Sequence, residues 1–236
     1  SGAEPAITLT APPAVTVVKP YRIRVSSVSG VTGSPLNPAT SSSGSGFLAA
    51  GQPFRLVLAV ENASGNRTPN FGRETTAAQL HVQFNQRVYP ADGVANASSL
   101  LNTGIFTALS GSAGSFANNQ LYYLQAGSFN LIGKLSNNDY LGAGNVTEQP
   151  VSATIGRFYP QAFVLSEATV GATCASANAA AGSHFSYLGQ PGIPLSFVLQ
   201  AVSAEPPGYQ RVVLTDYHSG RYQQTAAVGL VAENDS

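Results

Sequence analysis

The chain has 236 residues, and only 9% of them are charged, with 11 basic and 11 acidic side chains giving a net charge of zero. No basic excess is present to neutralise phosphates, which argues against nucleic-acid binding, and the charged fraction is too low for charge-rich disorder. No apolar run reaches the roughly eighteen residues that a membrane-spanning helix needs. Since the sequence contains no methionine, we expect a segment processed or excised from a longer product.

Short segments in which apolar and polar residues alternate recur along the whole chain. Strands are expected at residues 15–25, 54–60, 80–84, 121–124, 129–135, 151–155, 163–165, 195–199 and 212–214. The intervening segments are rich in Gly, Ser, Asn and Pro, as turns require, and 24 Gly and 15 Pro would interrupt long helices. Short helical turns are an alternative only at residues 95–108 and 175–181. The pattern therefore predicts an all-β fold of antiparallel β-sandwiches.

An internal echo spaced by about 140 residues divides the chain. Residues 19–25 match residues 159–165 in pattern, with a proline followed by apolar residues two apart. Residues 47–53 match residues 185–191, where an aromatic residue precedes Gly-Gln-Pro by four positions and an apolar strand follows. We expect this aromatic residue to plug the end of a sandwich. The alternative is that unrelated strands and turns converged on similar patterns.

The echo predicts two tandem immunoglobulin-like β-sandwich modules. We expect an extended segment at residues 1–13, a first module at residues 14–153, and a second, related module at residues 154–236 that is short or truncated.

Several motifs together resemble a known family. They lie at residues 17–21, 49–54, 69–74, 140–142, 155–160, 185–191 and 232–234, with Phe163, Tyr217 and Gly220 between them. These motifs are similar to those of the large extracellular domain of MshQ-like proteins, a family named after the mannose-sensitive haemagglutinin pilus system and largely catalogued as a domain of unknown function. The resemblance implies a secreted or cell-surface protein of a Gram-negative bacterium, associated with type IV pili. It carries over no catalytic residue.

The residues that usually perform catalysis or bind metals are few and scattered. His81, His184 and His218 lie far apart, and none has a second ligand at the spacing of a zinc site. Cys174 and His184 could form a catalytic pair of nucleophile and base. No third residue that would orient the histidine lies at a recognised spacing, so a small buried or loop thiol is the simpler interpretation of Cys174. The few acidic residues do not pair as in a glycosidase. We therefore predict no enzymatic activity, no catalytic residue, no metal site and no cofactor.

Two features remain as candidates for binding. Residues 137–139 offer oxygen ligands for a loop calcium near Asp139, as do Asp92 and Asn96, although Asn and Asp are also common in turns for conformational reasons. Tyr122 and Tyr123 are adjacent on a predicted strand, so one of the two rings must point away from the core. That ring is a candidate contact for a sugar or partner; the alternative is a tyrosine packed under a loop.

These observations predict a non-enzymatic extracellular protein with a structural or adhesive role, associated with a pilus or filament. A sandwich that lacks strands exposes edges, and residues 6–18 of a neighbouring copy could add a strand there, so the expected partners are other copies of the chain and pilus or surface proteins. The alternative is a carbohydrate-binding module or adhesin tip that recognises a surface glycan.

Overall fold

The computed structural model describes residues 17–39, 44–91, 97–146, 152–171, 174–175, 184–185, 192–218 and 222. These residues form strands and one short 3-10 turn at Ala97–Ser99, within the segment where a helical turn was an alternative. None of the helices in the described part is long and apolar enough to cross a membrane.

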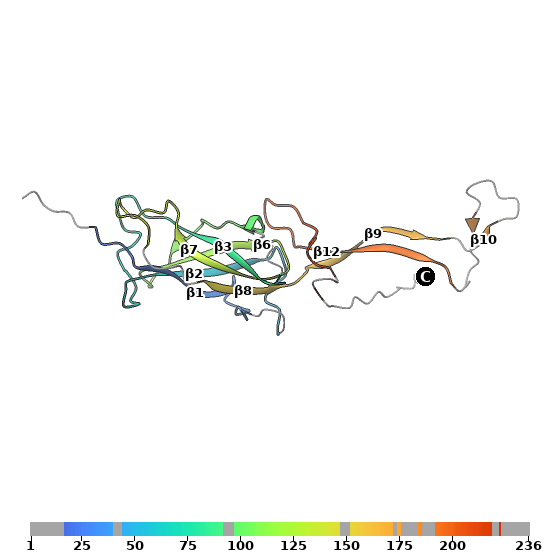
Figure 1. The fold of residues 1–236 in the computed structure, drawn as a ribbon, viewed down its shortest axis with the longest axis horizontal. Coiled ribbons are helices and arrows are strands. Elements are labelled where there is room, and N and C mark those ends of the chain that lie inside the picture. The colour runs from blue at the N-terminus through green and yellow to red at the C-terminus, as the bar shows by residue number, and fades with distance from the viewer. Residues whose placement is uncertain are drawn as a thin grey trace, which may run out of the picture.

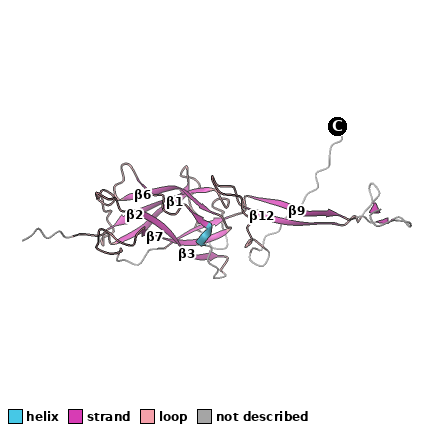
Figure 2. Ribbon diagram, turned by 90° about the horizontal axis from the view of Figure 1, so that it is seen from above, coloured by secondary structure: helices cyan, strands magenta, loops and turns pink. Residues whose placement is uncertain are grey.

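Two antiparallel sheets pack face to face over the first two thirds of the chain (Figures 1 and 2). The first sheet has the order β1 (Arg22–Gly30), β2 (Pro53–Glu61), β6 (Ser115–Tyr123) and β4 (Leu100–Leu101), and β5 (Thr107–Ala108) also pairs with β6. The strands form where apolar residues alternate, because one face of each strand is buried.

The second sheet has the order β3 (Leu80–Tyr89), β7 (Gly127–Leu135) and β8 (Ala153–Phe158). The two sheets approach closely at Gly133 of β7. A Cβ atom at this position would lie 2.7 Å from Ile23 Cγ2 and 3.0 Å from Leu58 Cδ2, so glycine allows the first sheet to pack against β7.

One aromatic cluster fills the core at the end of the sandwich where β2 begins. The ring of Phe158 lies 5.5 Å from that of Phe47 and 5.6 Å from that of Phe54, in edge-on and tilted arrangements. Tyr123 and Phe129 join them, with ring centroids 4.3 Å apart. Burial of each such side chain contributes roughly 1.5–3 kcal/mol. Phe47 is the aromatic residue four positions before Gly51, and it occupies the end of the sandwich as the echo predicts.

The remaining described strands form a ribbon that extends away from this end of the sandwich (Figures 1 and 2). The ribbon consists of β9 (Ala162–Val170) and β12 (Leu195–Val202), paired antiparallel, and β10 (Cys174–Ala175) pairs with β11 (His184–Phe185) between them in sequence.

A second, smaller core joins the base of the ribbon to the sandwich. This joint buries Ala50, Ala126, Ala201, Leu214 and Tyr222 together. The backbone N–H of Ala204 donates to the carbonyl of Ala50 at 2.7 Å. Gly51 adopts a φ of +81°, and a Cβ atom there would lie 2.5 Å from the carbonyl oxygen of Ala204, so glycine is required at this close approach.

A buried ion pair also crosses the joint. The Arg87 guanidinium on β3 donates to the Asp216 carboxylate at 2.6 Å. The joint therefore combines apolar burial with a charge pair, and both link the ribbon's base to the sandwich.

The predicted all-β class of antiparallel sandwiches is confirmed. β8, which begins at the expected boundary at residue 153, pairs with β7 and completes the second sheet of the sandwich through Phe158. Past Phe158 the described strands form the ribbon and the β10–β11 pair. A full second sandwich over residues 154–236 stays a prediction, and the extended segment at residues 1–13 lies outside the described residues.

Candidate functional site

The two adjacent tyrosines do not offer a binding platform. They point to opposite faces of β6, as expected, but Tyr123 is fully buried in the aromatic core and Tyr122 is only 6% exposed. The interpretation of Tyr122 or Tyr123 as an exposed sugar contact is therefore wrong for the described structure, because the ring outside the core is covered as well.

The histidines and the cysteine are not gathered into one site in the described part of the chain. His81 lies half-buried on β3, where burial and, secondarily, the charge of Lys134 lower its pKa. His218 follows the last described turn, and the side chains of Cys174 and His184 lie outside the described residues. Among the described residues, no group of three or more His, Cys, Asp and Glu side chains could hold a metal ion.

Asp139 organises its own loop. One carboxylate oxygen accepts a hydrogen bond from the backbone N–H of Gly142 at 2.8 Å, and the other accepts one from Gly144 at 2.7 Å. A calcium ion near Asp139 would compete with these bonds, and such an ion stays the alternative to the predicted absence of a metal site. Asp92 and Asn96 lie outside the described residues.

The end of the sandwich opposite the ribbon, called the loop end here, carries a buried carboxylate. Glu61 at the end of β2 is almost fully buried and accepts hydrogen bonds from Arg24 at 2.6 Å and Arg22 at 2.8 Å. The bond from Arg24, followed by the bond from Arg22, holds the pKa of Glu61 below its usual value although burial opposes the shift.

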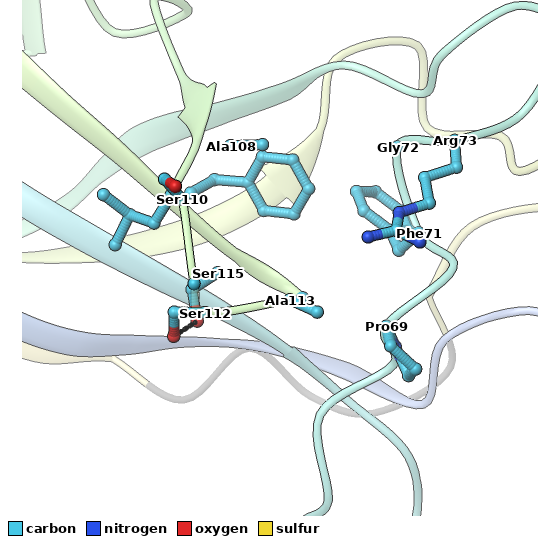
Figure 3. A pocket seen from close by; sticks show the side chains of 13 residues that line it. Pro69, Phe71, Gly72, Arg73, Ala108, Ser110, Ser112, Ala113 and Ser115 are labelled. Atoms are coloured by element: carbon cyan, nitrogen blue, oxygen red, sulfur yellow. Dashed lines mark hydrogen bonds between the residues drawn. The ribbon is translucent and has the colours of Figure 1, made fainter.

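A cleft of about 310 Å³ opens at the same end, between the segment 69–73 and the loop before β6 (Figure 3). Arg73 lines one side, and Ser110 and Ser112 line the other. Phe71 separates this cleft from a second depression, which is lined in part by Lys19 and Tyr140. The Tyr140 hydroxyl donates to Glu74 at 2.5 Å, and burial together with that carboxylate raises the pKa of Tyr140 to about 12.

The ribbon has one apolar face, called the ribbon face here. Directly paired residues share a face, and the pairs Phe163 with Ala201 and Leu165 with Leu199 place four apolar side chains together. Phe197, two residues before Leu199, extends this face. Phe163 is 49% exposed although its ring centroid lies 6.0 Å from that of Tyr217, and Leu165 is 56% exposed, so the described residues cover this face only in part.

The exposed part of the ribbon face and Arg73 of the cleft are the candidate features that sequence reasoning missed. The alternation in residues 163–165 and 195–199 did predict the strands. It did not show that these strands pair with each other outside the sandwich, because pairing depends on residues distant in sequence.

Comparisons with known proteins give two family matches. Residues 19–119 match the second domain of DUF6701, and residues 125–236 match its third domain. The sandwich draws strands from both matches, since β1 to β5 fall in the first and β7 and β8 in the second. Neither the curated proteins nor the solved structures give a match.

The matches name DUF6701 alone, and the resemblance to MshQ-like proteins stays a prediction. Because the two matched segments together span nearly all of the chain, the chain belongs to the DUF6701 family, of which it carries the second and third domains.

Proposed function

We propose that this chain is a non-enzymatic structural or adhesive protein of the cell surface that assembles with other copies through the ribbon. The observation that carries the proposal is the exposed part of the ribbon face, around Phe163 and Leu165. The association with a pilus or filament rests on the resemblance to MshQ-like proteins, as does the location on a Gram-negative bacterium.

The ribbon face corresponds to a core face of the first sandwich. In β1 and β2 the pairs Ile23 with Val60 and Val25 with Leu58 point into the core. The echo relates Ile23 and Val25 to Phe163 and Leu165 of β9, whose register partners in β12 are Ala201 and Leu199. Both strand pairs also contain a register shift, after Val25, the fourth residue of β1, and after Ser166, the fifth residue of β9. The ribbon therefore presents the surface that a second sheet covers in the first module.

A two-stranded ribbon is marginally stable on its own, and a third strand or a covering layer is needed to stabilise it. In the described structure β9 pairs only with β12, and the other edge of β12 meets a described neighbour only at its end, where Val202 forms an isolated bridge with Val213. Most of both ribbon edges therefore lacks a described neighbour. An added strand would satisfy the backbone groups of one edge and would help to bury the apolar side chains beside it.

The geometry favours assembly from head to tail. The described chain begins at the loop end, where the Lys19 ammonium donates to the carbonyls of Ala143 and Asn145. The ribbon lies at the opposite end. A strand donated from the amino-terminal side of one copy to the ribbon of the next makes a heterologous contact, and such contacts propagate into open filaments. The proposed donor at residues 6–18 lies almost wholly outside the described residues.

A charge substitution on the ribbon face tests the proposal. We expect the full chain to form larger species with rising concentration in analytical ultracentrifugation, and linear assemblies in negative-stain electron microscopy. Leu165→Lys should remain monomeric because it places a charge on the ribbon face. Leu36→Lys is the matched control, since Leu36 is 77% exposed but lies on the sandwich, and it should assemble as the unaltered chain does.

Two outcomes would contradict the proposal. One is a chain that stays monomeric at every accessible concentration, and the other is a Leu165→Lys variant that assembles normally. Removal of residues 1–18 tests the donor separately, because assembly that persists without them excludes residues 6–18 as the added strand.

A further inference from the structure

We propose that the cleft at the loop end binds a sugar that bears a carboxylate. This binding site goes beyond the proposed assembly through the ribbon and lies at the opposite end of the sandwich. The cleft is formed by the segment that contains Arg73 and by the loop from Ser110 to Gly114, and its volume of about 310 Å³ is sufficient for a ligand of one sugar ring.

The charge of the cleft favours an anion. Arg73 is exposed, and its guanidinium makes no hydrogen bond or ion pair with another described residue. Arg67 adds a second positive charge behind the serines, where it donates to the hydroxyls of Ser112 and Ser115. Among the described residues, none that lines the cleft is acidic. Glu74, which follows Arg73 in sequence, instead accepts the hydrogen bond from Tyr140.

Other cations at the loop end differ from Arg73 because they already have partners. Arg22 and Arg24 share the carboxylate of Glu61, and Lys19 donates to two backbone carbonyls. A guanidinium presents a planar fork of donors that fits a carboxylate through two parallel hydrogen bonds. With Arg73 as the single arginine lining the cleft, a singly charged carboxylate fits better than a phosphate dianion.

The opposite side of the cleft supplies the groups that hydroxyls recognise. The Ser110 hydroxyl and the backbone N–H groups of Ser110 and Gly111 make no hydrogen bond with another described residue (Figure 3). A hydroxyl both donates and accepts, and sugar hydroxyls need both functions. Gly111 adopts a φ of +73°, and no atom lies within 4 Å of a Cβ built there, so this part of the cleft stays open. The combination of Arg73 with these groups indicates an acidic sugar rather than a simple anion.

Binding of three small probes to the full chain tests the inference by titration calorimetry and saturation-transfer NMR. Glucuronate combines the carboxylate with the sugar ring, glucose has the ring alone, and acetate has the carboxylate alone. We expect measurable binding of glucuronate, and weaker binding of glucose and acetate. Arg73→Gln should weaken glucuronate binding about tenfold or more, since a charge-assisted hydrogen bond is lost. Ser110→Ala should weaken it by a smaller factor.

Arg211→Gln is the matched control, because Arg211 is also exposed but lies on the segment that follows the ribbon. It should bind glucuronate as the unaltered chain does. The inference is overturned if glucuronate does not bind, if glucose or acetate binds as tightly, or if Arg73→Gln leaves the affinity unchanged. Ultracentrifugation of Arg73→Gln separates this site from the proposed assembly, which should persist in that variant.

Discussion

At the joint, the Arg87 guanidinium is a charge almost completely withdrawn from water, and it pairs with the carboxylate of Asp216. Its side chain is 1% exposed, while that of Asp216 is 20% exposed. Removing Asp216 would take a counter-charge away from the buried guanidinium, which is more costly than replacing both groups. We expect Asp216→Asn to lower the free energy of unfolding by about 3 kcal/mol, measured by urea denaturation followed by circular dichroism.

The double variant Arg87→Met with Asp216→Asn provides the control. It removes the buried charge together with its partner, so it should recover most of the stability lost in Asp216→Asn. If the single and double variants are equally stable, the pair does not hold the joint in the way described.

Glu61 makes the stability of the loop end depend on pH. Its pKa is lowered in the folded chain, chiefly by the hydrogen bond from Arg24. A carboxylate with a lowered pKa contributes stability above its unfolded pKa of about 4.3, and this contribution is lost as the pH falls through the folded value. We expect the free energy of unfolding to fall more steeply with acidification below that pH in the unaltered chain than in Glu61→Gln.

The control for Glu61 is Glu205→Gln, an exposed acid near the joint for which the described residues provide no ion pair. This variant should keep the acid dependence of the unaltered chain. Identical pH profiles for Glu61→Gln and the unaltered chain would show that the contacts with Arg22 and Arg24 do not stabilise the fold.

Among the strands, the same apolar pattern has two different energetic consequences. Leu58 on β2 is fully buried between the sheets, while Leu165 on β9 belongs to the same pattern in the ribbon and is 56% exposed. Leu58→Ala would leave a cavity in a packed core, and we expect it to cost about 3 kcal/mol of unfolding free energy. Leu165→Ala should cost less than about 0.5 kcal/mol in the monomer.

Urea denaturation at a concentration where the chain is monomeric measures both values. A large loss in Leu165→Ala under those conditions would mean that part of the same chain covers the ribbon face. That result would contradict the assignment of this face to another copy.

The sequence predicted individual strands well because alternation is a local property. The strand expected at residues 54–60 is observed as β2, and those expected at residues 163–165 and 195–199 are observed as parts of β9 and β12. The module boundary at residue 153 stays a prediction. The assignment of β8 to the first sandwich depends on its pairing with β7, which alternation within β8 does not encode.

The candidate site was predicted less well than the strands. Adjacency correctly placed Tyr122 and Tyr123 on opposite faces of a strand, but the burial of Tyr122 depends on residues that lie over the outer face of the sheet. Nothing in the sequence around Arg73 distinguished it from the other arginines as a candidate binding residue. A guanidinium is distinguished by whether its neighbours in space neutralise it, and here Glu74 is engaged with Tyr140.

Taken as a whole, the molecule separates two surfaces by the length of the sandwich. The ribbon extends from one end, and the cleft with Arg73 opens at the other. A head-to-tail contact that uses the amino-terminal side of one copy would place the next copy near the loop end. The site for an acidic sugar and the contact with the next copy would then lie at the same end of the molecule.

The salt dependence of assembly should distinguish apolar contact from electrostatic contact between copies. Raising sodium chloride from about 0.1 M to about 1 M shortens the Debye length from about 10 Å to about 3 Å and weakens attraction between charges. The ribbon face consists of apolar side chains, and the chain carries no net charge. We therefore expect the association constant from ultracentrifugation to hold or rise over this range, and to rise further in sodium sulfate, which strengthens apolar burial. Dissociation by sodium chloride would instead assign the contact to charged residues outside the ribbon face.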